Sequence, residues 1–200
     1  MRIEDLVIAC DIDGVVNDLP LAVLSVYNED YNDTLTIDDI TTYYMENFVK
    51  PEAKDKFYEY YTDKRTWKRI SAINVEAVQY LIDHAKKFFF CTSTEPCNLG
   101  KKANWLERTF KNFSARKQLV RMYDKGDIVA DVLIDDCTSN LLADDIKLNV
   151  CIDWAYNRDY DGLRCNTVQD FIDWVNEEDK ISRKIFERVE KSGGWFNDIN

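Results

Sequence analysis

The sequence has little histidine, no CxxC pair and no apolar run long enough to cross a bilayer. Its one histidine, His84, lies in a stretch with helical spacing of apolar residues, so we expect a surface helix residue and not a catalytic base. Acid–base chemistry must then be carried by carboxylates. The start of the chain lacks the basic and apolar regions of a signal peptide. We therefore expect a cytoplasmic protein with no membrane contact.

The six cysteines have neither the spacing of a zinc site nor that of a disulfide framework. Cys10, Cys91 and Cys151 lie inside apolar runs typical of strands, where a thiol behaves as a small hydrophobic side chain. The sequence therefore predicts free thiols.

Positive charge is also in short supply, because 26 lysines and arginines stand against 37 acidic residues and the net charge is −11. A surface this acidic repels polyphosphate backbones, so we expect no binding to long DNA or RNA. The length of 200 residues suits one domain with an insertion, and a hydrophobic content of 46% excludes a disordered chain. The oligomeric state is open, with a homodimer as one option.

A short apolar run near the start of the chain ends in two carboxylates, Asp11 and Asp13, followed by Gly14. Such a run is typical of a buried parallel strand, and open α/β sheets bind ligands at the carboxyl ends of their strands. In an extended chain the two carboxylates point to the same side. Because like charges repel, the pair needs a cation or must protonate one member. An ordinary polar strand end would also fit this motif alone.

Polar residues follow the later apolar runs as well. Thr92 and Ser93 follow the second run, and small hydroxyl groups there can donate hydrogen bonds to an anion. Lys125 precedes the fourth run, which ends in Asp135 and Asp136. Lys102 follows Gly100 at the expected start of a helix, where phosphate is attracted, although a solvated helix face also fits.

Apolar runs alternate with helical patterns along the chain. Strands are expected at 7–10, 88–91, 118–122, 132–134 and 149–154, and helices at 19–31, 37–49, 52–63, 74–87, 101–110 and 167–189. This alternation predicts a parallel, doubly wound α/β sheet.

Residues 19–70 contain no strand and are rich in tyrosine and charge. They predict a small helical cap over the carboxyl end of the sheet, with residues 1–18 and 71–200 forming the core domain. Most of the aromatic side chains should pack the cap helices together, while one or two could stack on a flat ring of a ligand. Residues 154–164 are expected at the rim of the site without an assigned role.

The order of these strand ends, Asp-x-Asp, Thr-Ser, a lysine and Asp-Asp, resembles the haloacid dehalogenase superfamily of phosphohydrolases. Within it, Asp-Ile-Asp-Gly-Val-Val-Asn-Asp, Cys-Thr-Ser, Tyr-Asp-Lys and Asp-Val-Leu-Ile-Asp-Asp look most like the 5′(3′)-deoxyribonucleotidases. The resemblance implies a Rossmannoid core with a helical cap inserted after the first strand. It also implies a Mg²⁺-dependent phosphatase that acts on (deoxy)nucleoside monophosphates.

The resemblance further implies roles for individual residues. Asp11 would be the nucleophile that forms an aspartyl-phosphate, and Asp13 the general acid and base. Mg²⁺ would be held by the carboxylates of Asp11 and Asp136 and the main-chain carbonyl of Asp13, with Asp135 as an additional or supporting carboxylate. Lys125 would neutralise the nucleophile.

The phosphate would be bound by Thr92 and Ser93, with Lys102 as a further contact. Two alternatives stay open. One is a phosphatase of the same superfamily that acts on another small phosphomonoester, such as a sugar phosphate or a nucleic-acid end. The other is a non-catalytic nucleotide-binding protein that kept the fold.

Overall fold

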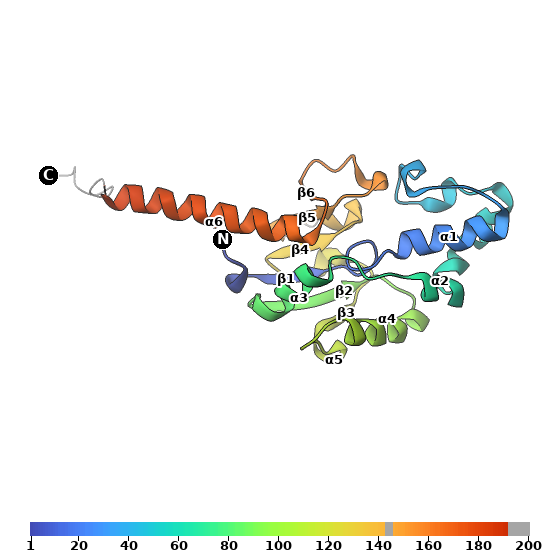
Figure 1. The fold of residues 1–200 in the computed structure, drawn as a ribbon, viewed down its shortest axis with the longest axis horizontal. Helices are drawn as coiled ribbons and strands as arrows, with labels where there is room; N and C mark the ends of the chain where they lie inside the picture. The colour runs from blue at the N-terminus through green and yellow to red at the C-terminus, as the bar shows by residue number, and fades with distance from the viewer. Residues whose placement is uncertain (143–145, 192–200) are drawn as a thin grey trace.

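A computed structural model describes residues 1–142 and 146–191 of the chain. Its centre is one parallel sheet with the strand order β3-β2-β1-β4-β5-β6 (Figure 1). The strands are β1 (Val7–Cys10), β2 (Lys87–Thr92), β3 (Leu119–Arg121), β4 (Val132–Asp135), β5 (Leu148–Ile152) and β6 (Leu163–Cys165). The predicted parallel α/β sheet is confirmed. Strand β6 was not predicted, because its three residues are too short a run to stand out in the sequence.

The direction in which the strands are added changes between β1 and β4. From β1 the chain moves outward to β2 and β3, then returns to β4 on the other side of β1. Cys10 accordingly lies opposite Phe90 of β2 and Ile134 of β4. Open α/β sheets bind ligands outside the carboxyl ends of the strands at such a point. The carboxylates that follow β1 and β4 therefore meet at the expected place for a site.

A separate hydrophobic cluster packs against each of the two faces of the sheet. The helices are α1 (Leu19–Tyr31), α2 (Lys64–Arg69), α3 (Val75–His84), α4 (Pro96–Thr109), α5 (Ala115–Gln118) and α6 (Val168–Lys191). Val78 of α3, Leu106 of α4 and Phe171 of α6 belong to the cluster that packs on one face. The opposite face packs against Ile128 and Leu141, which lie in or beside short 3₁₀ turns.

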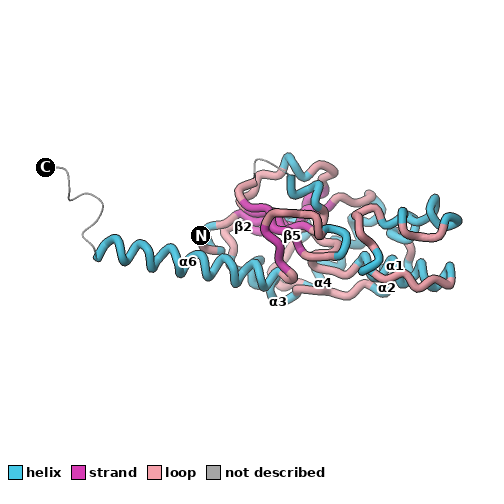
Figure 2. The backbone as a smooth tube through the Cα atoms, turned by 90° about the horizontal axis from the view of Figure 1, so that it is seen from above, coloured by secondary structure: helices cyan, strands magenta, loops and turns pink. Residues whose placement is uncertain are grey.

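Residues 19–70 gather beyond the carboxyl end of the sheet, whereas α6 extends in the opposite direction (Figures 1 and 2). Their helices are α1, η2 (Ile37–Asp39), η3 (Met45–Asn47), η4 (Pro51–Tyr61) and α2. Buried side chains of this region form a hydrophobic cluster together with Tyr156, and Tyr27 and Phe57 are at 0% exposure in it. Most of the aromatic side chains here pack against one another, as the composition indicated.

The predicted helix over 37–49 is wrong. Only the two 3₁₀ turns η2 and η3 form there, separated by the run Ile-Thr-Thr-Tyr-Tyr over 40–44. β-Branched and aromatic residues are poor helix formers, which explains the break. The predicted helix over 52–63 is a 3₁₀ helix, η4. It is followed by α2, whose N-cap residue Asp63 accepts a hydrogen bond from the Arg65 main-chain nitrogen.

The helix expected to start after Gly100 begins earlier, at Pro96. Proline is favoured in the first turn of a helix, and a helix interior tolerates one glycine. Lys101 and Lys102 therefore lie in the second turn of α4 and not at its positive end, so the predicted attraction of phosphate to this helix end does not involve them.

Two other expectations, for His84 and for the cysteines, are confirmed. His84 is exposed at the end of α3, where its ring stacks on Tyr80. All six cysteines are free, and five of them are buried. Among the helices that the structure describes, none is both long enough and apolar enough to cross a membrane.

Candidate active site

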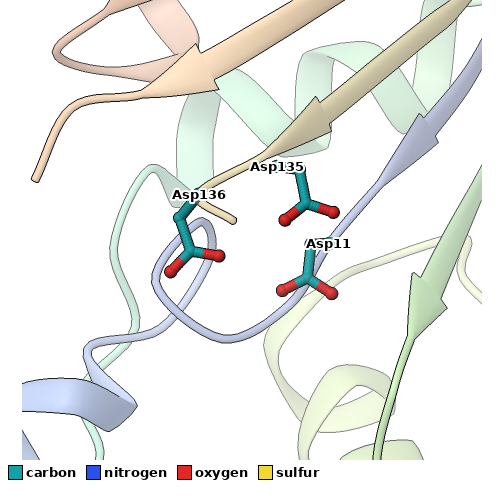
Figure 3. Close-up of side chains that lie close together, drawn as sticks. All are labelled: Asp11, Asp135 and Asp136. Carbon is teal, nitrogen blue, oxygen red and sulfur yellow. The ribbon is translucent and has the colours of Figure 1, made fainter. Parts of the chain in front are cut away.

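Three buried carboxylates meet where β1 and β4 end. Among the described residues, Asp11, Asp135 and Asp136 each offer an oxygen within 4.8 Å of the others (Figure 3). The Asp11 main-chain nitrogen donates to the Ile134 carbonyl at 2.8 Å, so the pairing of the two strands continues to the carboxylates. Adjacent parallel strands thus bring together residues that are more than 120 positions apart in the sequence.

Lys125 supplies a positive charge inside this cluster. Its Nζ atom donates to Asp11 Oδ1 at 2.5 Å and to Asp135 Oδ2 at 2.6 Å, and the residue is 2% exposed. It lies in the 3₁₀ turn η5 (Lys125–Asp127), which is capped by the Asp124 side chain. The ammonium group therefore neutralises part of the negative charge that the sheet concentrates here.

Asp135 is held by further donors. Its Oδ1 atom accepts hydrogen bonds from the Cys137 main-chain nitrogen at 2.9 Å and from Asn140 Nδ2 at 3.2 Å. With Lys125 on Oδ2, both oxygens of this carboxylate already have partners. This arrangement favours a supporting role for Asp135 over that of a direct metal ligand.

Burial shifts the pKa values of these groups because the charged forms lose water. It raises the pKa of Asp11 to about 6, with Lys125 acting against the shift and Asp135 adding to it. Burial, Asp135 and Asp11 together raise the pKa of Asp136 well above its ordinary value. The same burial would lower the pKa of Lys125, but the Asp11 and Asp135 carboxylates outweigh it and raise that pKa. The cluster thus retains unbalanced negative charge that a divalent cation would stabilise.

A second cluster of polar side chains lies beside the three carboxylates and Lys125. Lys102 Nζ donates to Asp13 Oδ2 and, at 2.7 Å, to Thr92 Oγ1. Asn17 Nδ2 donates to the other oxygen of Asp13 at 3.0 Å. Lys102 and Thr92 are buried, whereas Asp13 is half-buried and faces the cavity. Lys102 therefore contacts the loop after β1 although it does not lie at a helix N-terminus.

Ser93 is exposed at the edge of the same cavity, with no hydrogen bond from its side chain to the described residues. The structure thus brings seven of the predicted residues into two contacting groups, and it places Ser93 beside them. The individual roles that the resemblance implies for these residues stay predictions.

Gly14 allows Asp136 to approach the loop after β1. Its φ angle is +74°, a left-handed conformation that side chains disfavour. A Cβ atom at this position would lie 2.7 Å from Asp136 Cγ and closer still to Oδ2. Only glycine provides both the turn and the space for this carboxylate.

We expect Gly14→Ala to lower the free energy of unfolding by about 1–2 kcal/mol from backbone strain alone. Displacement of Asp136 would add to that loss. Gly100→Ala is the matched control, because a Cβ there meets nothing within 4 Å. In a helix interior this change should raise stability by about 0.5–1 kcal/mol. Urea unfolding of both variants measures the difference. Equal stability of the two variants would contradict the conclusion that position 14 requires glycine.

Two residues that the sequence did not single out contact Asp136. The Tyr156 hydroxyl donates to Asp136 Oδ2 at 2.5 Å, and Asn157 Nδ2 donates to the Asp136 carbonyl at 2.7 Å. Both lie in the 3₁₀ turn η7 (Ala155–Asn157), which follows β5. Their position after a buried strand was the available signal, and residues 154–164 were expected only to form a rim.

A cavity of about 350 Å³ opens above the carboxylates. Asp13, Asp136 and Lys102 line it at the polar end. Its walls carry the aromatic rings of Tyr43, Tyr58, Tyr61, Trp67, Tyr123 and Tyr156. A cavity of this size, largely apolar with a few converging polar groups, fits a small ligand that has both a flat ring and a charged end.

Helix α4 links the sheet to residues 19–70 at the mouth of the cavity. Asn98 Nδ2 donates to the Tyr61 carbonyl at 3.1 Å, and Lys101 Nζ donates to the Thr62 carbonyl at 3.2 Å. The Lys101 ammonium also lies 5.1 Å from the centre of the Trp67 ring. Trp67 in turn donates from Nε1 to the Tyr61 carbonyl. These contacts fix the aromatic wall relative to the carboxylates.

The donor set is chemically suited to a hard divalent cation. Buried carboxylate oxygens at the end of a parallel sheet are ligands that Mg²⁺ prefers. A cation here would also offset the unfavourable free energy of ionising Asp11 and Asp136 next to each other. The site can thus combine a carboxylate nucleophile with positive charge for an anionic substrate.

Comparison with known proteins gives consistent matches. Residues 5–182 match the family described as 5′ nucleotidase, deoxy (Pyrimidine), cytosolic type C protein. A 5′(3′)-deoxyribonucleotidase from Clostridium acetobutylicum is 27% identical over 132 residues, which cover 66% of this chain and 73% of that protein.

One of two solved structures in the comparison shows a similar fold. A Lactobacillus plantarum protein named as a phosphoglycolate phosphatase aligns with a TM-score of 0.52 and 14% identity, over 86% of this chain and 99% of its own. A haloacid dehalogenase-like hydrolase from Streptococcus pneumoniae aligns with a TM-score of 0.49 and 11% identity, over 86% and 98% of the two chains. The first of these alignments supports the fold alone.

Proposed function

The chain belongs to the 5′ nucleotidase, deoxy (pyrimidine), cytosolic type C family of haloacid dehalogenase-type phosphatases, and from this premise we propose that it is a Mg²⁺-dependent 5′(3′)-deoxyribonucleotidase. The substrates would be (deoxy)nucleoside monophosphates, and the products a nucleoside and phosphate. The observation that carries the proposal is the contact of Lys125 with Asp11 and Asp135, next to Asp136, which lines an aromatic cavity. We further propose that residues 19–70 act as the cap that supplies most of the aromatic wall.

In the first step, a carboxylate oxygen of Asp11 attacks phosphorus, and the bond from phosphorus to the nucleoside oxygen breaks. Asp13 donates a proton to that leaving oxygen. The products of this step are the free nucleoside and an aspartyl-phosphate on Asp11. The position of Asp13 in the cavity lining supports this role, and Asn17 and Lys102 limit the movement of its side chain.

In the second step, Asp13 accepts a proton from a water molecule, which attacks the phosphorus of the aspartyl-phosphate. The bond between phosphorus and the Asp11 oxygen breaks, and inorganic phosphate leaves. Lys125 stays in contact with Asp11 and stabilises the carboxylate that is regenerated. Lys102, Thr92 and Ser93 would donate hydrogen bonds to the phosphoryl oxygens.

Asp11, Asp136 and the main-chain carbonyl of Asp13 would hold Mg²⁺, with Asp135 supporting Lys125. A bound ion supplies positive charge next to the phosphoryl group and so lowers the repulsion between the substrate and the carboxylates. The unbalanced charge of the cluster, seen in the raised pKa values of Asp11 and Asp136, supports this fit.

The test is phosphate release from a panel of phosphomonoesters with Mg²⁺ and with EDTA. The panel holds 5′- and 3′-deoxynucleotides, the matching ribonucleotides and several sugar phosphates. We expect kcat/KM for the best deoxynucleotide to exceed that for every sugar phosphate by at least about tenfold, because a sugar lacks the flat ring. We expect EDTA to lower every rate by at least about a hundredfold, since the carboxylates then repel the substrate.

Two results would contradict the proposal. Faster turnover of sugar phosphates than of any nucleotide would assign the chain to a different phosphatase of the same superfamily. Undiminished activity in EDTA would refute the requirement for a metal ion. The substrate class would still be decided by the relative rates within the panel.

A further inference from the structure

We propose that Tyr156 is a positioning residue, whose hydroxyl group orients the Asp136 carboxylate for the divalent cation and thereby sets the affinity of the site for that ion. The inference rests on the proposed function, because it assumes that Asp136 is a metal ligand. It adds a residue from outside the four strand-end motifs, and it assigns a role to the turn that follows β5.

The contact leaves one oxygen of Asp136 available. The Tyr156 hydroxyl donates to Oδ2 at 2.5 Å, whereas no described residue donates a hydrogen bond to Oδ1. Figure 3 shows the carboxylate of Asp136 next to that of Asp11. A carboxylate fixed through one oxygen presents the other in a defined direction, which reduces the rotamer freedom that is lost when an ion binds.

The hydroxyl is itself held in place by packing. Tyr156 is 5% exposed, and its ring stacks on that of Trp154 with centres 6.0 Å apart and planes at 4°. The Tyr43 ring meets it edge-on at 6.0 Å. Trp154 Nε1 donates to the Gly14 carbonyl at 2.7 Å, which ties the stack to the loop after β1. The tyrosine therefore connects the loops that follow β1 and β4.

The neighbouring residue holds the main chain of Asp136. Asn157 Nδ2 donates to the Asp136 carbonyl at 2.7 Å and to the Ile152 carbonyl at 2.8 Å. Arg164 in turn donates to the Asn157 carbonyl. The turn after β5 thus fixes both the backbone and the side chain of Asp136, so the carboxylate has little freedom to move when an ion binds.

The charge of the group that donates to Asp136 affects metal binding as well as its position does. Asp11 and Asp135 share the positive charge of Lys125, which weakens their attraction for a second cation. A phenol donates a hydrogen bond without bringing a positive charge. Asp136 consequently has a hydrogen-bond partner for its second oxygen that brings no positive charge to compete with the metal ion. A lysine at position 156 would orient the carboxylate but would repel the ion.

The test compares Mg²⁺ binding by the parent protein, Tyr156→Phe and Tyr160→Phe, measured by calorimetry without substrate. Tyr160 is the matched control, since it is a half-buried tyrosine near the same turn that does not line the cavity. We expect Tyr156→Phe to raise the Mg²⁺ Kd by about 10–100-fold, and Tyr160→Phe to change it by less than about twofold.

Kinetics give an independent result. The Mg²⁺ concentration that gives half-maximal phosphate release should rise by the same about 10–100-fold in Tyr156→Phe, because the missing hydrogen bond affects mainly the binding of the ion. A merely structural role would instead change the unfolding temperature of the metal-free protein and leave the Mg²⁺ Kd as it was. Phenylalanine keeps the ring stack, and Tyr156→Met serves as a second hydroxyl-free variant if the first does not fold.

The possible failures are distinguishable. If the parent itself does not bind Mg²⁺, the proposed function fails in its metal requirement, and this inference fails with it. If the parent binds Mg²⁺ and the hydroxyl-free variants bind it equally well, only the role of Tyr156 is refuted. Equal losses in Tyr156→Phe and Tyr160→Phe would refute it too, because the effect would then not come from the contact with Asp136.

Discussion

Asp11→Asn should lower phosphate release by about 10⁴–10⁶-fold at saturating nucleotide and Mg²⁺, the range found when an enzyme loses its nucleophile. The amide nitrogen and oxygen of asparagine cannot replace the carboxylate in the attack on phosphorus. Initial-rate measurements with a sensitive phosphate assay check the result. No phosphorylated protein should be trapped from the variant by acid quenching.

The same substitution should not destabilise the metal-free protein at neutral pH. The pKa of Asp11 is about 6 in the fold, above the ordinary value of 3.8, so the fold disfavours the ionised form. A group with a raised pKa stabilises the fold less as the pH rises from its unfolded value through its folded value. Above about pH 6 the neutral asparagine removes this cost, while Lys125 retains its contact with Asp135. Thermal unfolding at pH 5 and pH 7.5 in EDTA measures the change.

Asp159→Asn is the control for charge removal, because Asp159 is exposed and does not line the cavity. It should leave both rate and stability within error of the parent. Activity of Asp11→Asn above about a hundredth of the parent rate would contradict nucleophilic catalysis by this residue. If the parent protein had no activity on any phosphomonoester, the result would instead support the alternative that the chain binds nucleotides without catalysis.

Lys125→Met should destabilise the protein by about 3–5 kcal/mol, because it leaves two buried carboxylates without their cation. Asp11 and Asp135 are 7% and 0% exposed, and both contact the ammonium group directly. Methionine fills a similar volume, so loss of packing contributes little. The free energy of unfolding is measured by urea titration in EDTA. Added Mg²⁺ should recover part of the loss, since an ion between the carboxylates replaces some of the missing charge.

Lys147→Met is the matched control. Lys147 also forms an ion pair, with Asp131 at 2.7 Å, but its side chain is 79% exposed. Water screens such a pair, so its removal should cost less than about 1 kcal/mol. If the two lysine variants lose equal stability, the charge balance assigned to the cluster is wrong. Activity of Lys125→Met should also fall by about a hundredfold or more, because Lys125 stabilises the Asp11 carboxylate.

Residues 19–70 show which structural features the spacing of apolar residues can predict and which it cannot. Apolar spacing correctly placed helix α1, and it indicated the absence of strands in this region. It was wrong over 37–49, because the competition between a helix and 3₁₀ turns depends on contacts that spacing does not describe. The run between the two turns carries Tyr43, and η3 begins at Met45; both residues line the cavity. The composition predicted aromatic packing, whereas the side chains that face the cavity depend on the three-dimensional arrangement.

The kind of fold and the chemistry that it could hold are readable from the amino-acid sequence. Short apolar runs that end in polar residues and alternate with helical patterns indicate buried parallel strands with reactive groups at one edge, because both burial and helical crossovers leave patterns in the local sequence. The carboxylates Asp11, Asp13, Asp135 and Asp136, together with Lys125, could all be identified in this way.

Which of these groups are in contact depends on the way the strands and loops pack in three dimensions. The strand order places β4 next to β1, so Asp11 meets Asp135 and Asp136, and Lys125 inserts between two carboxylates. It also brings Lys102 to Asp13 and Tyr156 to Asp136, over separations of 89 and 20 residues. Local sequence encodes whether a residue is buried, but its partner depends on how distant strands and loops pack, since contact energies act only at short range in space.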